Sequence, residues 1–410
     1  MKKLLGLLAV AALMPVAANA EVLSNVNLKG EIQTIASDVK HNTPAPAKMY
    51  NDGTSVRVLA GLSADLVEDV TANVMFQYNN TWGNDSASGK NLDGYWNDAT
   101  LVEGNVVLHN LFCCLEATIG RQFYGDEDSA VMYVGPNHYN AERNGYVQSL
   151  DAAKVTYSDD TKAFTVIAGR VNNSFDNWTG NAVAPAADNF GVFGADLKLN
   201  LTDTLTAQVY GYDLTGSEAI TGDKHTGFYG AKLALNPEDG IRLAAEYARN
   251  FGGDRLVKEH NNTGDMVKVD AALDVKEITV RGTFYYATEN FFAMGNYTPG
   301  LLVGHWLGGA MEDYTATNAA GVAMFNLGFD MKPADKWTVS LDGYSFQDKN
   351  FHHTATYEAD LTAKYDHNEY VQLFAGVGYA HYAKHFADFS KEALGFGDNV
   401  KGQLGMLIKF

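Results

Sequence analysis

Apolar and polar residues alternate with a period of two along most of the chain, which is the pattern of a β-strand with two unlike faces. The C-terminal stretch NVKGQLGMLIKF, residues 399–410, is the clearest example. Val400, Leu404 and Ile408 fall on one face of this stretch, while Lys401 and Lys409 fall on the other. Segments of the same kind predict about eighteen strands, at residues 28–37, 54–66, 69–81, 100–111, 115–123, 149–158, 162–171, 189–201, 204–215, 226–236, 240–251, 265–275, 277–289, 319–332, 336–347, 353–365, 369–383 and 398–410.

The connections between the predicted strands alternate between short turns and long loops. The turns are rich in the Asp, Asn and Pro that tight turns favour, and they lie at 67–68, 112–114, 159–160, 202–203, 237–239, 276, 333–335 and 366–368. The loops lie near 38–53, 82–99, 124–148, 172–188, 216–225, 252–264, 290–318, 348–352 and 384–397. Short periplasmic turns and long extracellular loops are typical of outer-membrane β-barrels. We therefore predict an all-β fold, a single transmembrane antiparallel up-and-down β-barrel of about eighteen strands, with about sixteen as the alternative.

The two faces of the predicted strands differ in polarity. One face carries apolar residues such as Val74, Leu243 and Leu361, and we expect it to contact lipid. The other face carries charged and amide side chains, which the interior of a soluble β-sandwich could not accommodate. Because a barrel of about sixteen or more strands encloses an aqueous lumen, we predict that the second face lines a water-filled pore. The predicted pore-lining residues are Lys29, Glu31, Arg57, Lys154, Lys198, Lys232, Arg242, Glu246, Lys268, Asp270, Arg281, Glu358, Asp360, Lys364 and Lys401.

Aromatic residues gather at the ends of the lipid-facing sets, as they do at the two interfaces of a membrane. We expect Tyr78, Tyr247, Tyr286 and Tyr379 at the outer interface, and Phe112, Tyr157, Phe164, Trp337, Tyr365 and Phe410 at the inner one. The last strand, ending on Phe410, resembles the closing strand of bacterial outer-membrane β-barrels, where it is also the signal for assembly. The resemblance implies three partners, namely the barrel-assembly machinery, outer-membrane lipid and lipopolysaccharide.

The N-terminus and the composition fit an exported barrel. Lys2 and Lys3 precede an apolar run that ends at Ala18-Asn19-Ala20, so residues 1–20 are predicted to be a cleaved signal peptide and residues 21–410 the barrel. The chain has 40 Gly, 22 Tyr and 21 Phe but only 8 Pro, and no linker divides it. One large closed sheet accounts for this composition. The net charge of −19 without a basic patch makes nucleic acid an improbable partner.

The stretch IGRQFYGDEDSAVMYVGP, residues 119–136, is the most distinctive in the chain. It looks like the GRQ-x-YGD segment of the alginate-export family, and ENFFAMGNYTPGLLVGHW, residues 289–306, is similar to a second segment of that family. The resemblance implies a barrel of about eighteen strands that passes an anionic polysaccharide outward. It places Arg121 and Gln122 at the mouth of the pore, and Tyr124, Gly125 and Asp126 at the base of a loop.

Strict alternation conflicts with an inward Arg121. This residue shares the parity of Ile119, which we place outward, and Arg170 conflicts with Phe164 in the same way. Either a β-bulge turns both arginines inward, or both reach the lipid headgroups. We predict the inward arrangement and add Arg121, Gln122 and Arg170 to the pore-lining set.

The predicted function is a passive channel for small hydrophilic solutes or ions. Acidic residues gather in the loops, so the strands leave a pore wall of mixed charge, whereas a channel for a polyanion should be basic along its path. A polysaccharide exporter like the alginate-export family and a structural or adhesive surface barrel plugged by its loops remain as alternatives. The lumen-facing tyrosines could stack on sugar rings or simply fill the wall; they are Tyr210, Tyr212, Tyr285, Tyr344 and Tyr370.

The loop at 124–148 is the predicted constriction. It is long, and its apolar residues would be unfavourable as an exposed patch but could pack inside the barrel. The residues expected at the constriction are Tyr124, Asp126, Glu127, Asp128 and Tyr133, with Arg121 facing them. The loop at 290–318 is equally apolar and is the competing candidate.

The residues that could carry other chemistry form no recognisable site. Cys113 and Cys114 are adjacent in a predicted turn, where two small residues are a simpler interpretation than a redox or metal pair. The histidine pairs His352-His353 and His381/His385 accompany no nucleophile elbow. The acidic loops lack the spacing of a calcium loop. We therefore predict no enzymatic activity, no cofactor and no metal.

Overall fold

The computed structural model describes residues 24–41, 53–82, 99–112, 114–141, 144–145, 147–172, 191–215, 226–237, 240–251, 263–288, 291, 294–303, 321–383 and 397–410. The predicted signal peptide lies outside the described residues, as do most of the long loops. In the part of the chain that is described, no helix is long and apolar enough to cross a membrane.

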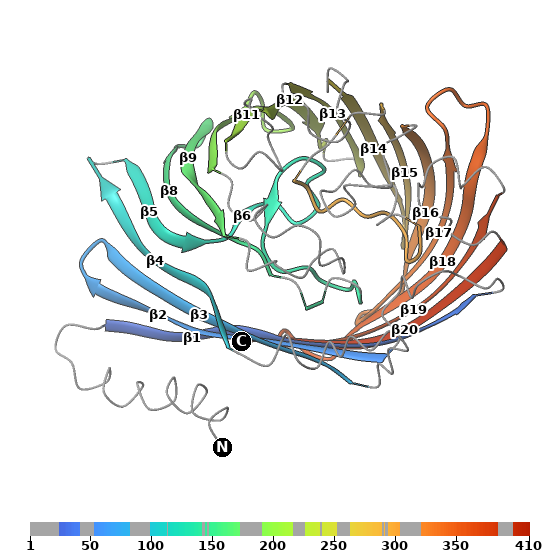
Figure 1. Cartoon of the computed structure of the whole chain (residues 1–410), viewed down its shortest axis with the longest axis horizontal. Coiled ribbons are helices and arrows are strands. Elements are labelled where there is room, and N and C mark those ends of the chain that lie inside the picture. The colour runs from blue at the N-terminus through green and yellow to red at the C-terminus, as the bar shows by residue number, and fades with distance from the viewer. Residues whose placement is uncertain are drawn as a thin grey trace.

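Within these ranges, eighteen strands form one antiparallel sheet (Figure 1). They are β1 (Ser24–His41), β2 (Gly53–Val67), β3 (Val70–Trp82), β4 (Thr100–Leu111), β5 (Leu115–Gln122), β8 (Ser149–Ser158), β9 (Lys162–Asn172), β10 (Gly191–Asn200), β11 (Leu205–Thr215), β12 (Thr226–Leu235), β13 (Ile241–Phe251), β14 (Asp265–Val275), β15 (Ile278–Ala287), β16 (Val322–Ala334), β17 (Trp337–Gln347), β18 (Thr354–Asp366), β19 (Val371–Tyr382) and β20 (Gly397–Lys409). Every one lies on a predicted segment, so the prediction of an eighteen-stranded barrel is confirmed, and the sixteen-stranded alternative is wrong.

The sheet closes because its last strand pairs with its first. β20 runs antiparallel to β1, with Ile408 opposite Ile32 and Leu404 opposite Ala36. The main chains of Gly30 and Phe410 exchange two hydrogen bonds, with N···O distances of 2.8 and 3.0 Å. Closure leaves no edge of unpaired N–H and C=O groups, which an open sheet would expose. The prediction that the C-terminal stretch is the closing strand is therefore confirmed.

The two faces of the wall differ as the alternation predicts. Phe193, Val209 and Leu404 point away from the barrel axis and are 59%, 54% and 63% exposed. Many inward-facing residues are charged or amide side chains, and others are buried against chain that lies inside the barrel. Such a distribution is the reverse of a soluble β-protein, whose apolar side chains face its interior.

Two segments fold into the barrel interior (Figure 1). We call residues 123–141, 144–145 and 147–148 the first inner segment, and residues 291 and 294–303 the second inner segment. The first contains two short strands that were not predicted, β6 (Tyr124–Gly125) and β7 (Tyr133–Val134), which pair with each other in a separate sheet. Together with the inward faces of the wall, these segments form the main hydrophobic core of the protein.

Candidate functional site: a constriction built from two inner segments

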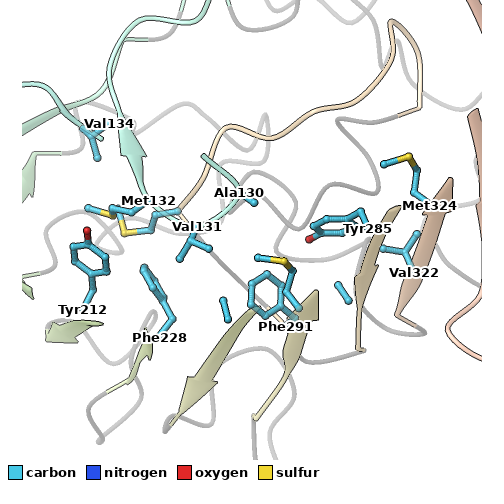
Figure 2. Close-up of a cluster of buried hydrophobic side chains, with 14 of the residues drawn as sticks. Ala130, Val131, Met132, Val134, Tyr212, Phe228, Tyr285, Phe291, Val322 and Met324 are labelled. Carbon is cyan, nitrogen blue, oxygen red and sulfur yellow. The ribbon is translucent and has the colours of Figure 1, made fainter. Parts of the chain in front are cut away.

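The first inner segment is anchored to the wall by apolar side chains. Val131, Met132 and Val134 are almost completely buried, and they belong to one cluster with Tyr212 and Phe228 of the wall (Figure 2). This packing removes from water the apolar residues that would be unfavourable in an exposed loop. The described part of the loop at 124–148 therefore packs against the inner face of the wall.

A buried polar network holds the middle of the same segment against β1 and β2. The guanidinium of Arg57 is completely buried, and it donates hydrogen bonds to the carbonyl oxygens of Asn137 (2.7 Å) and Asn144 (3.1 Å). It also forms an ion pair with Glu31. Gln33 donates to Asn144 Oδ1 (2.6 Å) and accepts from the Tyr139 N–H (3.1 Å). These six residues therefore fix the segment by directional contacts, which apolar packing alone does not provide.

His138 lies at the centre of this network, between two carboxylates. Its Nε2 is 2.7 Å from Glu31 Oε2, and its Nδ1 is 2.7 Å from Glu127 Oε2. Burial acts to lower the pKa of His138, but the hydrogen bonds and charges of Glu127 and Glu31 outweigh it and raise the pKa above the ordinary value. Burial likewise acts to raise the pKa of Glu127, and the contact with His138 outweighs it and lowers that pKa. Imidazolium and carboxylate are therefore the favoured charge states.

Tyr139 continues the contact along the wall toward β18, β19 and β20. The Lys364 Nζ lies 3.7 Å from the centre of the Tyr139 ring, and the Phe374 ring packs edge-on at 5.0 Å. Gln403 donates a hydrogen bond to the Tyr139 carbonyl oxygen at 3.1 Å. A cation over an aromatic face is attracted by the ring quadrupole. Lys364 is thus held by the inner segment, although it also faces the lumen.

The second inner segment is joined to the first by main-chain hydrogen bonds. The Met294 N–H donates to the Val131 carbonyl oxygen, and the Tyr133 N–H donates to the Met294 carbonyl oxygen, both at 2.8 Å. The Asn296 N–H donates to the Ser129 carbonyl oxygen at 2.9 Å. The two inner segments, which belong to the two competing candidate loops, are therefore joined to each other inside the barrel.

The far end of the second inner segment is held by a buried carboxylate. Glu358 accepts hydrogen bonds from the main-chain N–H groups of Leu301 (2.7 Å), Leu302 (2.6 Å) and Val303 (2.9 Å). Gly300 has a φ of +82°, and a Cβ at this position would lie 2.8 Å from the Glu358 carboxylate. Glycine is therefore required here both for the left-handed backbone and for the close approach of the carboxylate.

Three more wall groups complete this anchor. Asp360 Oδ2 accepts a second hydrogen bond from the Leu301 N–H at 2.9 Å, and Lys401 donates to the Leu301 carbonyl oxygen at 3.0 Å. Lys268 lies with its Nζ 4.4 Å from the centre of the Tyr297 ring. The second inner segment is thus fastened to β14, β18 and β20 by acidic and basic side chains.

The predicted pore-lining residues face inward with two exceptions. Eight of them lie beneath the inner segments or within the wall and are less than 10% exposed: Glu31, Arg57, Gln122, Glu246, Lys268, Glu358, Asp360 and Lys401. Eight others are more exposed toward the lumen: Lys29, Lys154, Lys198, Lys232, Arg242, Asp270, Arg281 and Lys364. Six members of the first group contact the inner segments, whereas Gln122 and Glu246 contact residues of the wall. We call the second group the wetted wall.

Arg121 and Arg170 are the two exceptions, and their predicted inward placement is wrong. Arg121 shares the outer face with Ile119, which is 54% exposed, and it lies in register with Asp151, which in turn lies opposite Arg170. Arg121 donates to both Asp151 carboxylate oxygens, at 2.7 and 2.8 Å. The nearby register shift lies in β4, because Glu103 and Leu101 pair with the consecutive residues Met75 and Phe76 of β3. The pairing of β5 with β8 has no shift, so no bulge there moves Arg121 to the other face. Both arginines lie near the strand ends, where a charged side chain on the outer face is least unfavourable.

The wetted wall carries both signs of charge, as the sequence predicts. Arg242 pairs with Asp274 at 2.5 Å, and Arg281 pairs with Asp330 at 2.6 Å. Lys29 pairs with Glu103 at 2.8 Å. Lys198 of β10 and Lys232 of β12 both lie opposite Gln208 of β11, which is the strand between them.

Some of the predicted constriction residues are held by contacts inside the protein, and others are exposed. Tyr124 is joined to Tyr212 by a contact of 2.9 Å between their hydroxyl oxygens, and Tyr133 donates to the Pro136 carbonyl oxygen. Asp126 and Asp128 are exposed, whereas Glu127 is held by His138. The two aspartates are therefore the acidic groups that this segment presents to the lumen.

The lumen-facing tyrosines fill space between the wall and the inner segments. Tyr210, Tyr212 and Tyr285 are each less than 8% exposed, and Tyr210 donates to Glu246 at 2.7 Å. Buried rings cannot serve as stacking platforms for a passing sugar. Tyr370, by contrast, lies exposed in the turn before β19.

The remaining candidates for chemistry lie apart from the constriction. Cys114 is exposed in the turn between β4 and β5, while Cys113 and His385 lie outside the described residues. His352 and His353 lie in the connection after β17, and His381 contacts Asp398 at 2.8 Å on the outer face. The described residues include no group of three His, Cys, Asp or Glu side chains that could hold a metal ion.

Sequence reasoning missed the residues that position the first inner segment. His138, Asn137 and Asn144 lie in a loop, where alternation does not indicate the direction in which a side chain points. Gln33 is one of many polar residues on the inward face of the wall, and alternation does not distinguish it from the others. The one available signal was the polar run NHYNAERNGY at 137–146, which follows the largely apolar run AVMYVGP at 130–136. Side chains with both donors and acceptors in an infolded loop are suited to contact a polar wall.

Several solved structures share the fold of this chain. Acinetobacter baumannii OccAB2 aligns with a TM-score of 0.64 over 96% of this chain and 99% of that protein, at 10% identity. Pseudomonas aeruginosa OpdO aligns with a TM-score of 0.63 over 95% and 98% of the two chains, at 11% identity. Pseudomonas aeruginosa OprD aligns with a TM-score of 0.59 over 96% and 97%, at 11% identity. At such identities the likeness extends to the fold alone.

Comparison at the level of sequence gives no relative. No protein-family model matches the chain, and no curated protein matches it. The resemblance to the alginate-export family, carried by residues 119–136 and 289–306, is therefore not supported by a comparison.

Proposed function

We propose that this protein is a passive channel of the bacterial outer membrane for small hydrophilic solutes and ions. The observation that carries the proposal is a closed barrel, apolar outside, whose interior keeps water-exposed charges around two infolded segments. An apolar outer wall suits lipid, and a lumen with ionic walls suits hydrated solutes. Transport requires no reaction and no cofactor. Conductance of the purified protein in planar lipid bilayers tests the proposal, and absence of conductance would favour a plugged structural or adhesive barrel.

The membrane location predicts unequal effects of arginine on the two faces of one strand. Val209 is 54% exposed on the outer face of β11, and its neighbour Gln208 faces the lumen, where it contacts Asp196. We expect Val209→Arg to destabilise the barrel by about 2–4 kcal/mol, because the charge would face hydrocarbon near mid-strand. Gln208→Arg should change stability little, since it meets water and a carboxylate. Urea titration of folding in lipid vesicles measures both, and equal losses would contradict the assignment of the faces.

Small solutes suit the constriction better than a polymer. Both inner segments cross the lumen and are fixed to the wall at several buried points, so a polysaccharide chain would have to displace them. The wall also alternates cationic and anionic groups, whereas a path for a polyanion should be basic throughout. We therefore propose that the channel passes small solutes in preference to alginate-like polysaccharides.

Charge selectivity should depend on the lysines of the wetted wall. Lys198 and Lys232 face the lumen on either side of Gln208, about 10 Å apart across the intervening strand. We expect the double variant K198E/K232E to shift the ratio of anion to cation permeability toward cations by roughly threefold or more. Reversal potentials across a salt gradient measure the ratio. Arg121→Gln, on the outer face, is the matched control and should leave the ratio unchanged; a larger effect of the control would contradict the assigned faces.

The same proposal includes the partners of an outer-membrane barrel. Tyr247 and Arg249 contact Asp265 on the outer face near one strand end, and Arg121 contacts Asp151 at the same end of the barrel. Ion pairs at this level suit the zone of lipid and lipopolysaccharide headgroups. The closing strand that ends at Phe410 is the segment we propose for recognition by the barrel-assembly machinery.

A further inference from the structure

We propose that His138 is a protonation-dependent latch that sets the width of the constriction. The inference rests on the proposed channel function, and it adds a regulation that the channel function does not itself require. The geometry points to it because both ring nitrogens of one loop histidine lie 2.7 Å from carboxylate oxygens of different elements, Glu31 of β1 and Glu127 of the first inner segment.

Only a protonated imidazole can satisfy both contacts. A neutral imidazole has one N–H and one lone pair, so one of the two ionised carboxylates would face a lone pair at hydrogen-bond distance. The imidazolium donates at both nitrogens, and such charge-assisted bonds are stronger than neutral ones. The His138 side chain is only 10% exposed, so water has little access with which to replace a lost partner. Loss of one proton therefore breaks one of the two imidazole contacts, while the main-chain N–H of His138 still donates to Glu127 Oε1 at 2.7 Å.

The surroundings of His138 favour the charged form. The charged groups around it are Glu31 from β1, Arg57 from β2 and Glu127 from its own segment. Farther away, Lys364 of β18 and Tyr133 of the segment interact with Glu127. Two carboxylates contact the ring directly, whereas Arg57 reaches it only through Glu31. The pKa of His138 is accordingly raised above its ordinary value.

The sign of the effect follows from this raised pKa. A histidine whose pKa is raised by docking contributes its full stabilisation below the ordinary pKa of about 6.5 and loses it as pH rises through the raised value. The first inner segment is thus held most firmly at acidic and neutral pH and is loosened at alkaline pH. The hydrogen bonds from Arg57 to the Asn137 and Asn144 carbonyl oxygens do not involve His138, so the segment remains attached. The expected change is a second, wider conductance level and not complete opening.

Single-channel recordings between pH 6 and pH 9 at constant salt test the latch. In the wild-type protein we expect the ratio of wide to narrow levels to rise roughly tenfold or more with pH. His138→Gln carries no charge, so it should occupy the wide level at all these pH values. Glu127→Gln should move the midpoint of the transition to lower pH, because one of the carboxylates that raise the pKa is removed. His109→Gln, at a histidine near the turn that follows β4, should retain the wild-type profile.

A titration independent of conductance completes the test. The imidazole signal of His138, assigned in NMR spectra by its loss in His138→Gln, should titrate above the ordinary histidine pKa in detergent micelles. Titration at or below that value overturns the latch. If His138→Gln fails to fold, loss of the signal in His138→Asn provides the assignment. A conducting channel whose levels do not respond to pH also overturns it while leaving the channel function intact. Absence of conductance at every pH would instead contradict the channel function.

Discussion

Deletion of residues 128–142 should raise the single-channel conductance roughly twofold or more, because it removes the part of the first inner segment that crosses the lumen. Val131, Met132 and Val134 would no longer pack against Tyr212 and Phe228 of the wall. The strands on either side, β5 and β8, pair directly with each other, so the barrel should close without the segment. Conductance in planar bilayers measures the effect, and the heat-dependent gel mobility of the folded barrel confirms assembly.

The matched deletion removes residues 290–318. Both inner segments are joined through Met294 and Val131, so each deletion should weaken the position of the other segment, and the two effects should not be additive. Shortening the exposed turn at 348–351 is a control that should leave conductance unchanged. If only the 290–318 deletion widened the pore, the second inner segment would form the constriction by itself.

Glu358→Ala should release the end of the second inner segment and raise conductance, although Asp360 still accepts one hydrogen bond from Leu301. The substitution removes a buried carboxylate that accepts from three main-chain N–H groups, at Leu301, Leu302 and Val303. Each buried donor left unsatisfied costs about 1–3 kcal/mol, so docking of this end should weaken by about 3 kcal/mol or more. Single-channel conductance and protease susceptibility of residues 291–303 measure the release.

Two further variants separate the role of Glu358 from a general effect of losing a carboxylate. Glu358→Gln keeps one acceptor oxygen but not the charge, so its effect should be intermediate. Glu369→Ala, in an exposed turn outside the lumen, should behave as the wild type. A wild-type conductance and protease pattern in Glu358→Ala would mean that apolar packing alone fixes the segment.

The anchor of the second inner segment at Glu358 and the anchor of the first inner segment at His138 should respond differently to pH. Alkaline pH favours the ionised Glu358 carboxylate that accepts from main-chain N–H groups, whereas it removes the proton by which His138 helps to hold the first segment. Alkaline pH should therefore loosen the first inner segment more than the second. The direct hydrogen bonds between Val131 and Met294 then limit how far the first can move.

The alternation of side chains determined the barrel. Because a strand side chain points to one face or the other with a period of two, sequence alone placed Leu243 outside and Lys198 inside, and it located all eighteen strands of the described sheet. The same alternation placed Arg121 outward. The inward prediction came from a resemblance of short motifs, and the tertiary structure supports the alternation.

Only the tertiary structure decided what the inward residues do. Alternation states that Glu358 and Lys198 both face the interior, but it does not state that Glu358 lies beneath an inner segment while Lys198 faces water. The difference depends on where two loops come to rest, and loops have no fixed period from which direction can be read. Their positions depend on contacts between residues distant in sequence, such as His138 with Glu31 and Leu301 with Glu358. The sequence therefore determined the wall of this protein, and long-range packing and hydrogen bonding inside the wall determined its constriction.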